Sequence, residues 1–204
     1  MKLYYMPGAC SLATHILMRE SGQKVELEKV GRDKKTESGA NFLEISPKGY
    51  VPALRLDDGD ILTENVVVHN YLADLKPESK LAPAPGTKAR LKQDELALYI
   101  TTEIHKTYSP LFNPATPDEV KKGQKDKLAQ RYDLIEKLLS DGRPYLTGQN
   151  FATVDSYLFT VTRWGAAMGL DLSAFPRLLE FQKRVAARPA VHAALEAEGL
   201  LKAS

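Results

Sequence analysis

The residue best suited to chemistry is the single cysteine of the chain, Cys10, which follows Pro7-Gly8-Ala9 and precedes a helix-like segment. The first turn of a helix presents outward-pointing N–H groups and a partial positive charge, both of which favour a thiolate. We therefore expect the pKa of Cys10 to lie below the usual value of about 8.5. The alternative is a buried, inert thiol. Two side chains are candidate helpers: Ser11, which could instead cap the helix, and Tyr5, whose phenol could point toward the sulfur.

Two further segments could bind an extended, acidic ligand. Pro52 precedes an alternating segment and either begins a strand or forms a cis bond in a tight turn. Val51 could then pair its backbone with an extended peptide. Thr63 is placed to cap a helix beginning near Glu64, whose N–H groups and the Asn65 amide form a potential carboxylate site. Plain strand initiation and plain helix capping are the simpler readings of these segments.

His105 and Lys106 lie on a long helical segment, beside its apolar stripe, and His105 suits either a functional or a packing role. The other histidines show no ligand spacing, so we expect no metal site. With one cysteine, an internal disulfide is impossible and a cysteine zinc site is excluded. A reducing compartment, the cytoplasm, fits this composition best.

The first 76 residues alternate between strand and helix signals. Strands are predicted at 3–5, 25–30, 53–56 and 61–62, and helices at 11–21, 40–44 and 64–75. A strand–helix–strand start implies a parallel pair, and the turn at Asp57-Asp58-Gly59-Asp60 adds an antiparallel pair. The order βαβαββα therefore predicts an α/β domain with a mixed four-stranded sheet.

The remainder of the chain reads as helical. Residues 77–86 contain three prolines and a glycine and are predicted to be a linker. Helices are predicted at 87–109, 118–140, 153–168, 176–187 and 189–198. The predicted domains are therefore 1–76 and an all-α domain at 87–204.

Composition sets broad limits. Of 204 residues, 43% are hydrophobic and 26% charged, as in a soluble globular protein. A net charge of +2 is too small to indicate a nucleic-acid or anionic-membrane partner. No apolar run approaches the ~20 residues of a membrane span, and the first residues lack the apolar stretch of a secretory signal.

A set of collinear motifs covers essentially the whole chain and resembles the bacterial beta-class glutathione transferases. The motifs are Met1-Lys2-Leu3-Tyr4-Tyr5, Pro7-Gly8-Ala9-Cys10-Ser11-Leu12-Ala13, Lys34-Lys35-Thr36, Ser46-Pro47-Lys48-Gly49, Val51-Pro52-Ala53-Leu54, Leu62-Thr63-Glu64, His105-Lys106, Ser109-Pro110-Leu111-Phe112, Asp155 with Tyr157-Leu158-Phe159, and Ala197-Glu198-Gly199-Leu200.

This resemblance implies a thioredoxin-like domain, an all-helical second domain, a homodimer and glutathione as co-substrate, without a metal. Cys10 would contact the glutathione sulfur and could form a mixed disulfide with it. Pro52 would be the family's cis-proline, and Val51 would pair with the cysteinyl backbone. The full set of implied contacts is Ala9, Cys10, Lys34, Tyr50, Val51, Pro52, Glu64, Asn65, His105 and Lys106, with Thr102 or Glu103 supplied by the partner subunit.

Three departures from the family pattern affect the expected contacts. Asn65 stands where the family has Gly or Ser, which alters the γ-glutamyl contact. The loop at Gly31-Arg32 is one residue shorter, so either Lys34 or Lys35 is the ligand. Ala152 cannot make the family's capping bond near Asp155, which costs ~1 kcal/mol unless Thr153 takes that role.

The expected reaction is conjugation of the glutathione thiolate to a small electrophile in a cleft between the two domains. His105, Tyr5 and Ser11 are expected to assist Cys10, and the charges of His105 and Lys106 to stabilise the thiolate. The electrophile pocket is expected from Tyr5, Met6, Pro7, Tyr108, Leu111, Phe112, Trp164 and Met168. Detoxification, dehalogenation and antibiotic sequestration all fit. The alternatives are a monothiol glutaredoxin-like enzyme and a non-catalytic binding module.

Overall fold

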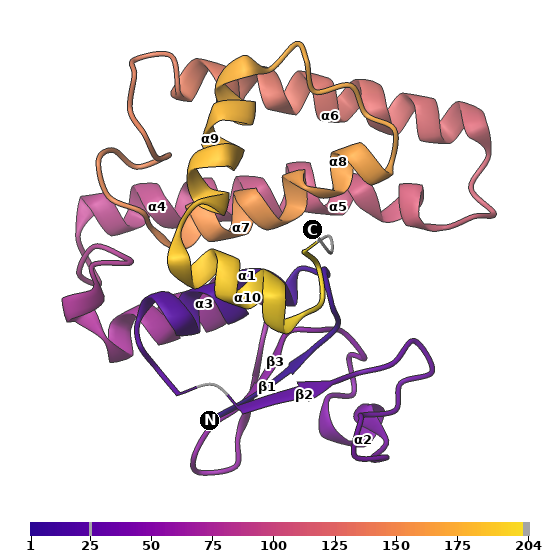
Figure 1. Ribbon diagram of the computed structural model, residues 1–204, viewed down its shortest axis with the longest axis vertical. Coiled ribbons are helices and arrows are strands. Elements are labelled where there is room, and N and C mark those ends of the chain that lie inside the picture. The colour runs from indigo at the N-terminus through magenta and orange to yellow at the C-terminus, as the bar shows by residue number, and fades with distance from the viewer. Residues whose placement is uncertain (25, 202–204) are drawn as a thin grey trace. The chain divides into compact units, whose positions relative to one another are not determined.

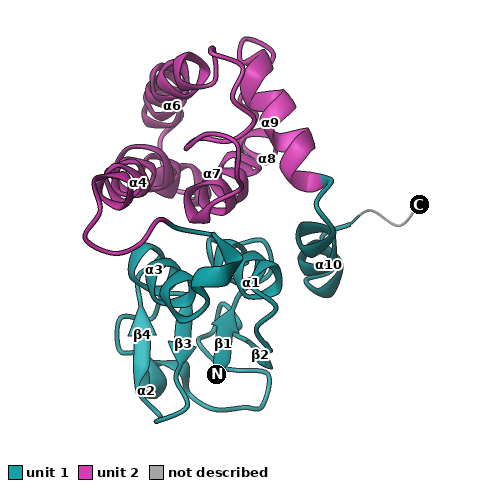
Figure 2. Ribbon diagram, turned by 90° about the vertical axis from the view of Figure 1, so that its left-hand side faces the viewer, with its two compact units in different colours: residues 1–82, 187–204 teal, residues 83–186 magenta. Residues whose placement is uncertain are grey.

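The computed structural model describes residues 1–24 and 26–201, which form two compact units. The first unit comprises residues 1–82 and the chain from Ala187 onward, and the second comprises Pro83–Ala186 (Figure 2). The last helix, α10 (Pro189–Ala197), therefore packs within the first unit, against α1 (Ser11–Glu20), although we predicted it within the C-terminal domain. Each unit is described separately below.

The first unit contains the mixed sheet predicted from the sequence. Its strands are β1 (Lys2–Tyr5), β2 (Glu26–Lys29), β3 (Ala53–Arg55) and β4 (Ile61–Thr63), in the order β2-β1-β3-β4 (Figure 2). Figure 1 labels β1, β2 and β3 of this sheet. Strand β1 pairs parallel with β2 and antiparallel with β3, which pairs antiparallel with β4. The helices are α1, α2 (Phe42–Ile45), α3 (Asn65–Leu75) and α10. Val25, expected to begin the second strand, lies outside the described residues. The order βαβαββα is that of a thioredoxin-like domain.

Alternation along β1 builds a core on each face of the sheet. Leu3 and Tyr5 pack with residues of α1 and α3, whereas Tyr4 packs on the opposite face with Phe42 of α2. Successive strand side chains point to opposite faces, so one four-residue strand serves both layers. The buried residues of the first cluster are Leu3, Tyr5, Met18, Leu54, Val68 and Leu72.

The second unit is helical, as predicted. Its predicted apolar stripes are buried: Ile100 and Ile104 are fully buried in the first of these segments, and Leu178 and Phe181 in the last. The α-helices are α4 (Lys88–Tyr99), α5 (Lys106–Tyr108), α6 (Asp118–Leu138), α7 (Thr153–Thr162), α8 (Trp164–Ala167) and α9 (Pro176–Ala186).

The predicted continuous helix at 87–109 is interrupted by a π-helical segment, Ile100–His105, between α4 and α5. Thr101 and Thr102 donate their hydroxyl hydrogen bonds to the carbonyls of Ala97 and Leu98, four residues earlier. Such bonds compete with the regular backbone ladder. π-Helical turns within α-helices often coincide with functional sites. This one carries three residues of the predicted site: Thr102, Glu103 and His105.

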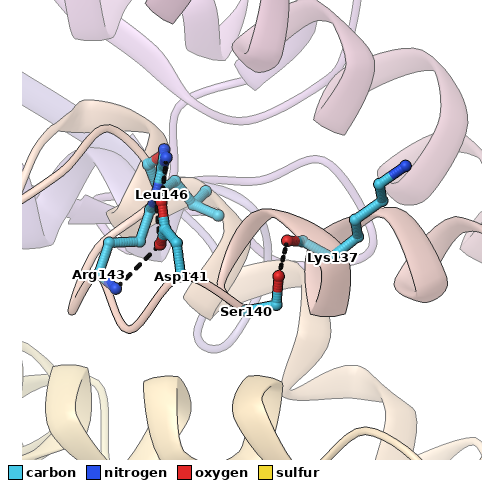
Figure 3. Close-up of polar contacts among 5 residues, drawn as sticks. All are labelled: Lys137, Ser140, Asp141, Arg143 and Leu146. Atoms are coloured by element: carbon cyan, nitrogen blue, oxygen red, sulfur yellow. Dashed lines mark hydrogen bonds and ion pairs between the residues drawn. The ribbon is translucent and has the colours of Figure 1, made fainter.

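A tight turn joins α6 to the segment that leads into α7. The Arg143 guanidinium pairs with Asp141 and donates to the carbonyl of Leu146, while the Ser140 hydroxyl donates to Lys137 (Figure 3). The Leu146 N–H in turn donates to Asp155 at 2.8 Å. The turn therefore anchors the first turn of α7.

Helix α7 begins without the family's side-chain cap, as expected from Ala152. The Asp155 carboxylate instead accepts the backbone N–H of Ala152 at 2.7 Å. Thr153 does not substitute as a cap, because Ala152 holds the cap position and no side-chain cap hydrogen bond is present. The Thr153 hydroxyl accepts a hydrogen bond from Gln93 at 2.8 Å. At the start of α7, the Asp155 carboxylate is therefore the side-chain group that binds the backbone of the cap residue.

Candidate functional site

Cys10 occupies the position predicted from the sequence, as the residue that precedes α1. The residue is half-buried, and its Sγ–H donates a hydrogen bond to the backbone oxygen of Val51 at 3.1 Å. The Val51–Pro52 peptide bond is cis, as the resemblance implied. Val51 precedes β3 and lies outside its ladder, which begins at Ala53. The sulfur therefore lies beside backbone that is outside the sheet ladder, of the kind that pairs with an extended peptide.

The expected low pKa of Cys10 is wrong for the unliganded protein. Burial of the sulfur raises the pKa of the thiol to about 11. Hydrogen bonds from the Asn65 side chain and from the N–H groups of Cys10 and Ser11 oppose this rise, whereas the Glu64 carboxylate adds to it. Desolvation thus outweighs the helix terminus. The resting state is a neutral thiol that can donate a hydrogen bond.

The two proposed helpers of Cys10 have other contacts. Ser11 does not cap α1: its hydroxyl donates to the Met6 carbonyl and accepts the Met6 N–H. This pair closes the loop between β1 and α1. Tyr5 lies in the core, with its ring centroid 6.3 Å from that of His15, and burial followed by the Glu198 charge raises its pKa. The direct roles proposed for Ser11 and Tyr5 remain predictions.

A buried carboxylate that we did not predict holds the loop before Cys10. Glu198, at the end of α10, accepts the Gly8 N–H at 2.9 Å and contacts the Nδ1 atom of His15 at 2.9 Å. Arg19 donates to the Nε2 atom of the same ring at 2.8 Å. Because Nε2 accepts from Arg19, the ring proton lies on Nδ1 and is donated to Glu198. Glu198 belongs to the Ala197-Glu198-Gly199-Leu200 motif, which marks it in the sequence. Its partners His15 and Gly8 lie 183 and 190 residues earlier, so the sequence does not indicate the contact.

Glu64 lies at the start of α3 with φ 71° and ψ 119°, a backbone conformation that only glycine adopts readily. Its carboxylate is exposed and accepts a hydrogen bond from Lys48 at 2.9 Å; Lys48 also donates to Thr63. Thr63 is not the helix cap that we predicted, because it closes β4 and Glu64 holds the cap position. A strained non-glycine residue often marks a ligand-binding position.

The structure distinguishes the two candidate lysines. Lys34 is half-buried and donates to the Gly49 carbonyl at 2.7 Å, with its Nζ atom 6.0 Å from the centroid of the exposed Tyr50 ring. Lys35 is exposed. Lys34 therefore borders the Tyr50–Val51–Pro52 segment. Of the two lysines, Lys34 is the better candidate for a ligand contact, which remains a prediction. Ala9 precedes Cys10 in a loop that is closed by the hydrogen bond from the Ala9 N–H to the Met6 carbonyl.

Asn65, expected to contact a γ-glutamyl group, is buried, and its side chain faces α1. Thr14 donates its hydroxyl hydrogen bond to Asn65 Oδ1 at 3.3 Å and lies 3.1 Å from His69 Nε2. Burial lowers the pKa of His69 to about 3, so this ring is neutral at physiological pH. Asn65 is therefore part of a buried polar chain beneath Cys10.

In the second unit, His105 lies among aromatic rings. Its Nδ1 atom is 2.6 Å from the Tyr157 hydroxyl, and its ring contacts Trp164 edge-on at 5.1 Å between centroids. Burial, followed by the Lys106 charge, lowers the pKa of His105 to about 4. The expected positive charge on His105 is therefore wrong at neutral pH. Lys106 is exposed.

The second unit also contains the aromatic residues expected to contact the electrophile and the two residues expected to contact a partner subunit. Phe112 is half-exposed and contacts Trp164 edge-on at 5.1 Å between ring centroids. Tyr108, which we expected to line the electrophile pocket, is fully buried beneath Phe112, because its ring packs in the core of this unit. Glu103 is paired with Arg131 at 2.8 Å, and Thr102 is exposed. Contact of Thr102 or Glu103 with a partner subunit remains a prediction.

Within the described residues, no group of three or more His, Cys, Asp or Glu side chains is arranged to hold a metal ion. In this same part of the chain, no helix combines the length and the apolar character needed to cross a membrane.

Comparison with known proteins identifies the family. The model of the glutathione S-transferase N-terminal domain matches residues 3–80, and that of the C-terminal domain matches residues 99–189. Glutathione S-transferase GstA of Escherichia coli O157:H7 is 45% identical over 98% of this chain and 100% of its own length. This chain belongs to the glutathione S-transferase family.

Two solved structures are similar to this chain over nearly its whole length. A sphingomonad glutathione S-transferase complexed with glutathione is 44% identical, with a TM-score of 0.94 over 98% of this chain and 100% of that one. The beta class enzyme of Sphingomonas chungbukensis is 42% identical, with a TM-score of 0.95 over the same shares. The chain is therefore similar to bacterial beta-class transferases.

Proposed function

We propose that this protein conjugates glutathione, as its thiolate, to small electrophilic compounds. The observation that supports this most strongly is the contact of Cys10 Sγ with the backbone oxygen of Val51, beside the cis bond to Pro52. An extended tripeptide that pairs with Val51 would bring its own sulfur to Cys10. Lys34, Tyr50 and Ala9 border the same segment, and Glu64 offers a carboxylate to the ligand's amino group.

The neutral state of Cys10 defines its role in this proposal. A thiol with a pKa of about 11 is a poor nucleophile at neutral pH but remains a hydrogen-bond donor. Glutathione in the site would replace the Val51 oxygen as acceptor of the Cys10 proton. That bond, together with the N–H groups at the start of α1, favours the glutathione thiolate. Cys10 thus stabilises the reacting sulfur without being the attacking group.

The aromatic surface of Phe112 and Trp164 is the proposed contact for the electrophile, with the fully buried Tyr108 ring behind Phe112. Phe112 is 49% exposed, and its ring centroid lies 5.1 Å from that of Trp164. An accessible pair of rings suits a flat, apolar compound. His105, neutral and bonded to Tyr157, would contribute a hydrogen-bonding ring rather than a charge.

The protein is proposed to act as a homodimer in the cytoplasm. Leu91 and Leu98, seven residues apart on α4, are 64% and 54% exposed, which places two large apolar side chains on one helix face. A second copy of the chain would cover them, and Thr102 or Glu103 would then approach the partner's site. Sedimentation of Leu98→Glu tests this, since a monomer is expected. The lone thiol of Cys10 supports a reducing compartment.

A monothiol redox enzyme is the competing function. Disulfide exchange requires a thiolate, and the raised pKa of Cys10 reduces its thiolate fraction at neutral pH. We therefore expect Cys10→Ala to lower conjugation by roughly tenfold through loss of one hydrogen bond to a charged group. Glutathione conjugation to an aryl halide and glutathione-dependent disulfide reduction would be measured side by side. Undetectable conjugation in the wild type, with active reduction, would replace this proposal by the redox one.

A further inference from the structure

A short hydrogen bond joins two rings of the second unit. The Tyr157 hydroxyl, on α7, lies 2.6 Å from the Nδ1 atom of His105, the last residue of the π-helical segment. Tyr157 is 1% exposed, so water competes little for this bond. The two rings meet edge-on, with their centroids 5.8 Å apart. The bond therefore ties the His105 ring to α7 in one orientation.

The length of this bond indicates its direction. Hydrogen bonds donated by an N–H group usually measure about 2.7–3.2 Å, whereas those donated by a hydroxyl measure about 2.5–3.0 Å. At 2.6 Å the contact lies within the hydroxyl range and below the N–H range. The Tyr157 hydroxyl is therefore the donor, and Nδ1 of His105 is the acceptor.

This direction places the proton of the His105 ring on its other nitrogen. A neutral imidazole carries one N–H, and the nitrogen without a proton is the one that accepts. Burial, followed by the Lys106 charge, lowers the pKa of His105 to about 4, so the ring is neutral at physiological pH. Because Nδ1 accepts from Tyr157, the proton lies on Nε2. The half-buried ring thus keeps an N–H donor at Nε2.

The His105 ring adjoins the aromatic surface of Phe112 and Trp164. Its centroid lies 5.1 Å from that of Trp164, whose own centroid lies 5.1 Å from that of the half-exposed Phe112. Small-molecule sites combine apolar rings with a few polar groups that select the ligand. An N–H donor next to two apolar rings suits a flat compound that carries an oxygen acceptor, such as a nitro or a carbonyl group.

We propose that Tyr157 is a positioning residue for His105: it donates its phenolic proton to Nδ1 and thereby keeps the Nε2–H available to an oxygen acceptor of the electrophile. The position of the ring proton follows from the hydrogen bond itself, whereas its use in selecting the electrophile rests on the proposed function. In this role Tyr157 acts through His105 and need not touch the electrophile.

The first test reads the ring proton directly. Long-range proton–nitrogen NMR spectra of the unliganded protein at neutral pH distinguish a protonated ring nitrogen from a bare one. The chain has four histidines, and the His105 signal is the one missing in His105→Gln. We expect a protonated Nε2 and a bare Nδ1. A proton on Nδ1 would overturn the proposal, because Tyr157 would then be the acceptor.

The second test compares two electrophiles that differ in the acceptor group. Conjugation of glutathione to para-nitrobenzyl chloride and to para-methylbenzyl chloride is measured as kcat/KM, and the ratio of the two values cancels general losses of activity. His105→Leu removes the donor and is expected to lower the ratio roughly fivefold, the effect of one neutral hydrogen bond. Tyr157→Phe lets the proton occupy either nitrogen and is expected to lower the ratio about twofold, since roughly half of the rings then lack the donor.

Tyr99→Phe is the matched control. It removes a hydroxyl of the same unit that donates to the Arg131 carbonyl, and it should keep both the wild-type ratio and the wild-type His105 signal. Circular dichroism checks the fold of each variant. Should Tyr157→Phe fail to fold, the wild-type spectrum and the His105→Leu ratio still decide the question.

A Tyr157→Phe ratio equal to that of the wild type would also overturn the proposal. Failure of the wild type to conjugate either halide would instead count against the proposed function, and the spectrum would still show which ring nitrogen carries the proton. The two failures are therefore distinguishable.

Discussion

The Cys10 thiol donates its proton to the backbone oxygen of Val51 at 3.1 Å, which joins the start of α1 to the residue before the cis bond of Pro52. These residues are 41 positions apart in the sequence. Burial raises the pKa of the Cys10 thiol, and the Val51 oxygen offers the protonated sulfur a hydrogen-bond acceptor.

The first prediction concerns the reactivity of Cys10 in the free protein. With a pKa of about 11, the thiolate fraction and hence the alkylation rate should rise about tenfold for each pH unit from 7 to 10. A small free thiol is the control and should level off near its own pKa of about 8.5. A plateau of the protein reaction below pH 8 would show that Cys10 is a preformed thiolate.

Glu64 should trade stability for ligand binding. Glycine adopts φ 71° without strain, so Glu64→Gly is expected to gain ~1 kcal/mol in the free energy of unfolding. It should also lose about tenfold in glutathione affinity, since a charged acceptor is removed. Lys80→Gly, with φ 56°, is the matched control that should gain stability without losing affinity. Equal affinity in Glu64→Gly and wild type would exclude Glu64 from the site.

Glu198 should be essential for stability. The side chain of Glu198 is fully buried, and its removal deletes the hydrogen bonds that the carboxylate accepts from His15 and from the Gly8 N–H. Glu198→Ala is expected to cost ~3 kcal/mol in urea unfolding, because two hydrogen bonds to a buried charged group are lost. Glu196→Ala, exposed on the same helix, should change little. A cost below that of the control would mean that α10 is held by apolar contacts alone.

His69 should make the fold sensitive to acid. Its pKa is about 3 in the folded protein, against about 6.5 when unfolded, so the unfolded chain binds more protons below pH 6.5. Stability is therefore present above pH 6.5 and lost as the pH falls toward 3. His69→Gln, which keeps a donor for Thr14, should show a shallower loss of Tm between pH 6.5 and 4. The exposed His192→Gln serves as the reference and should follow the wild type.

Much of the fold follows from local sequence signals. The alternation in Leu3-Tyr4-Tyr5, the turn at Asp57–Asp60 and the helical stripe of Ile100 and Ile104 each specify an element, and the structure has all of them. On α3, the apolar Val67 is 50% exposed, whereas the polar His69 is buried. A histidine satisfied by Thr14 is not visible in a hydrophobic pattern.

The electrostatics of the site depended on distant contacts and could not be predicted. The helix terminus at Cys10 was correctly located, but its effect on the pKa is smaller than that of burial, which depends on the whole surrounding structure. For the same reason the charge on His105 was misjudged. Lys48 and Glu198 were missed as partners, because no local pattern links Lys48 to Glu64 or Glu198 to Gly8.

The most direct test of the central claim is protection of Cys10 by S-methylglutathione, which has no free thiol and cannot form a disulfide. The wild-type protein is alkylated with iodoacetamide at pH 9 over a range of ligand concentrations, and modification of Cys10 is followed by mass spectrometry. A ligand that pairs with Val51 should cover the sulfur, so the rate is expected to fall to a low, saturable limit. An alkylation rate that stays constant at every ligand concentration would contradict the placement of glutathione at Cys10.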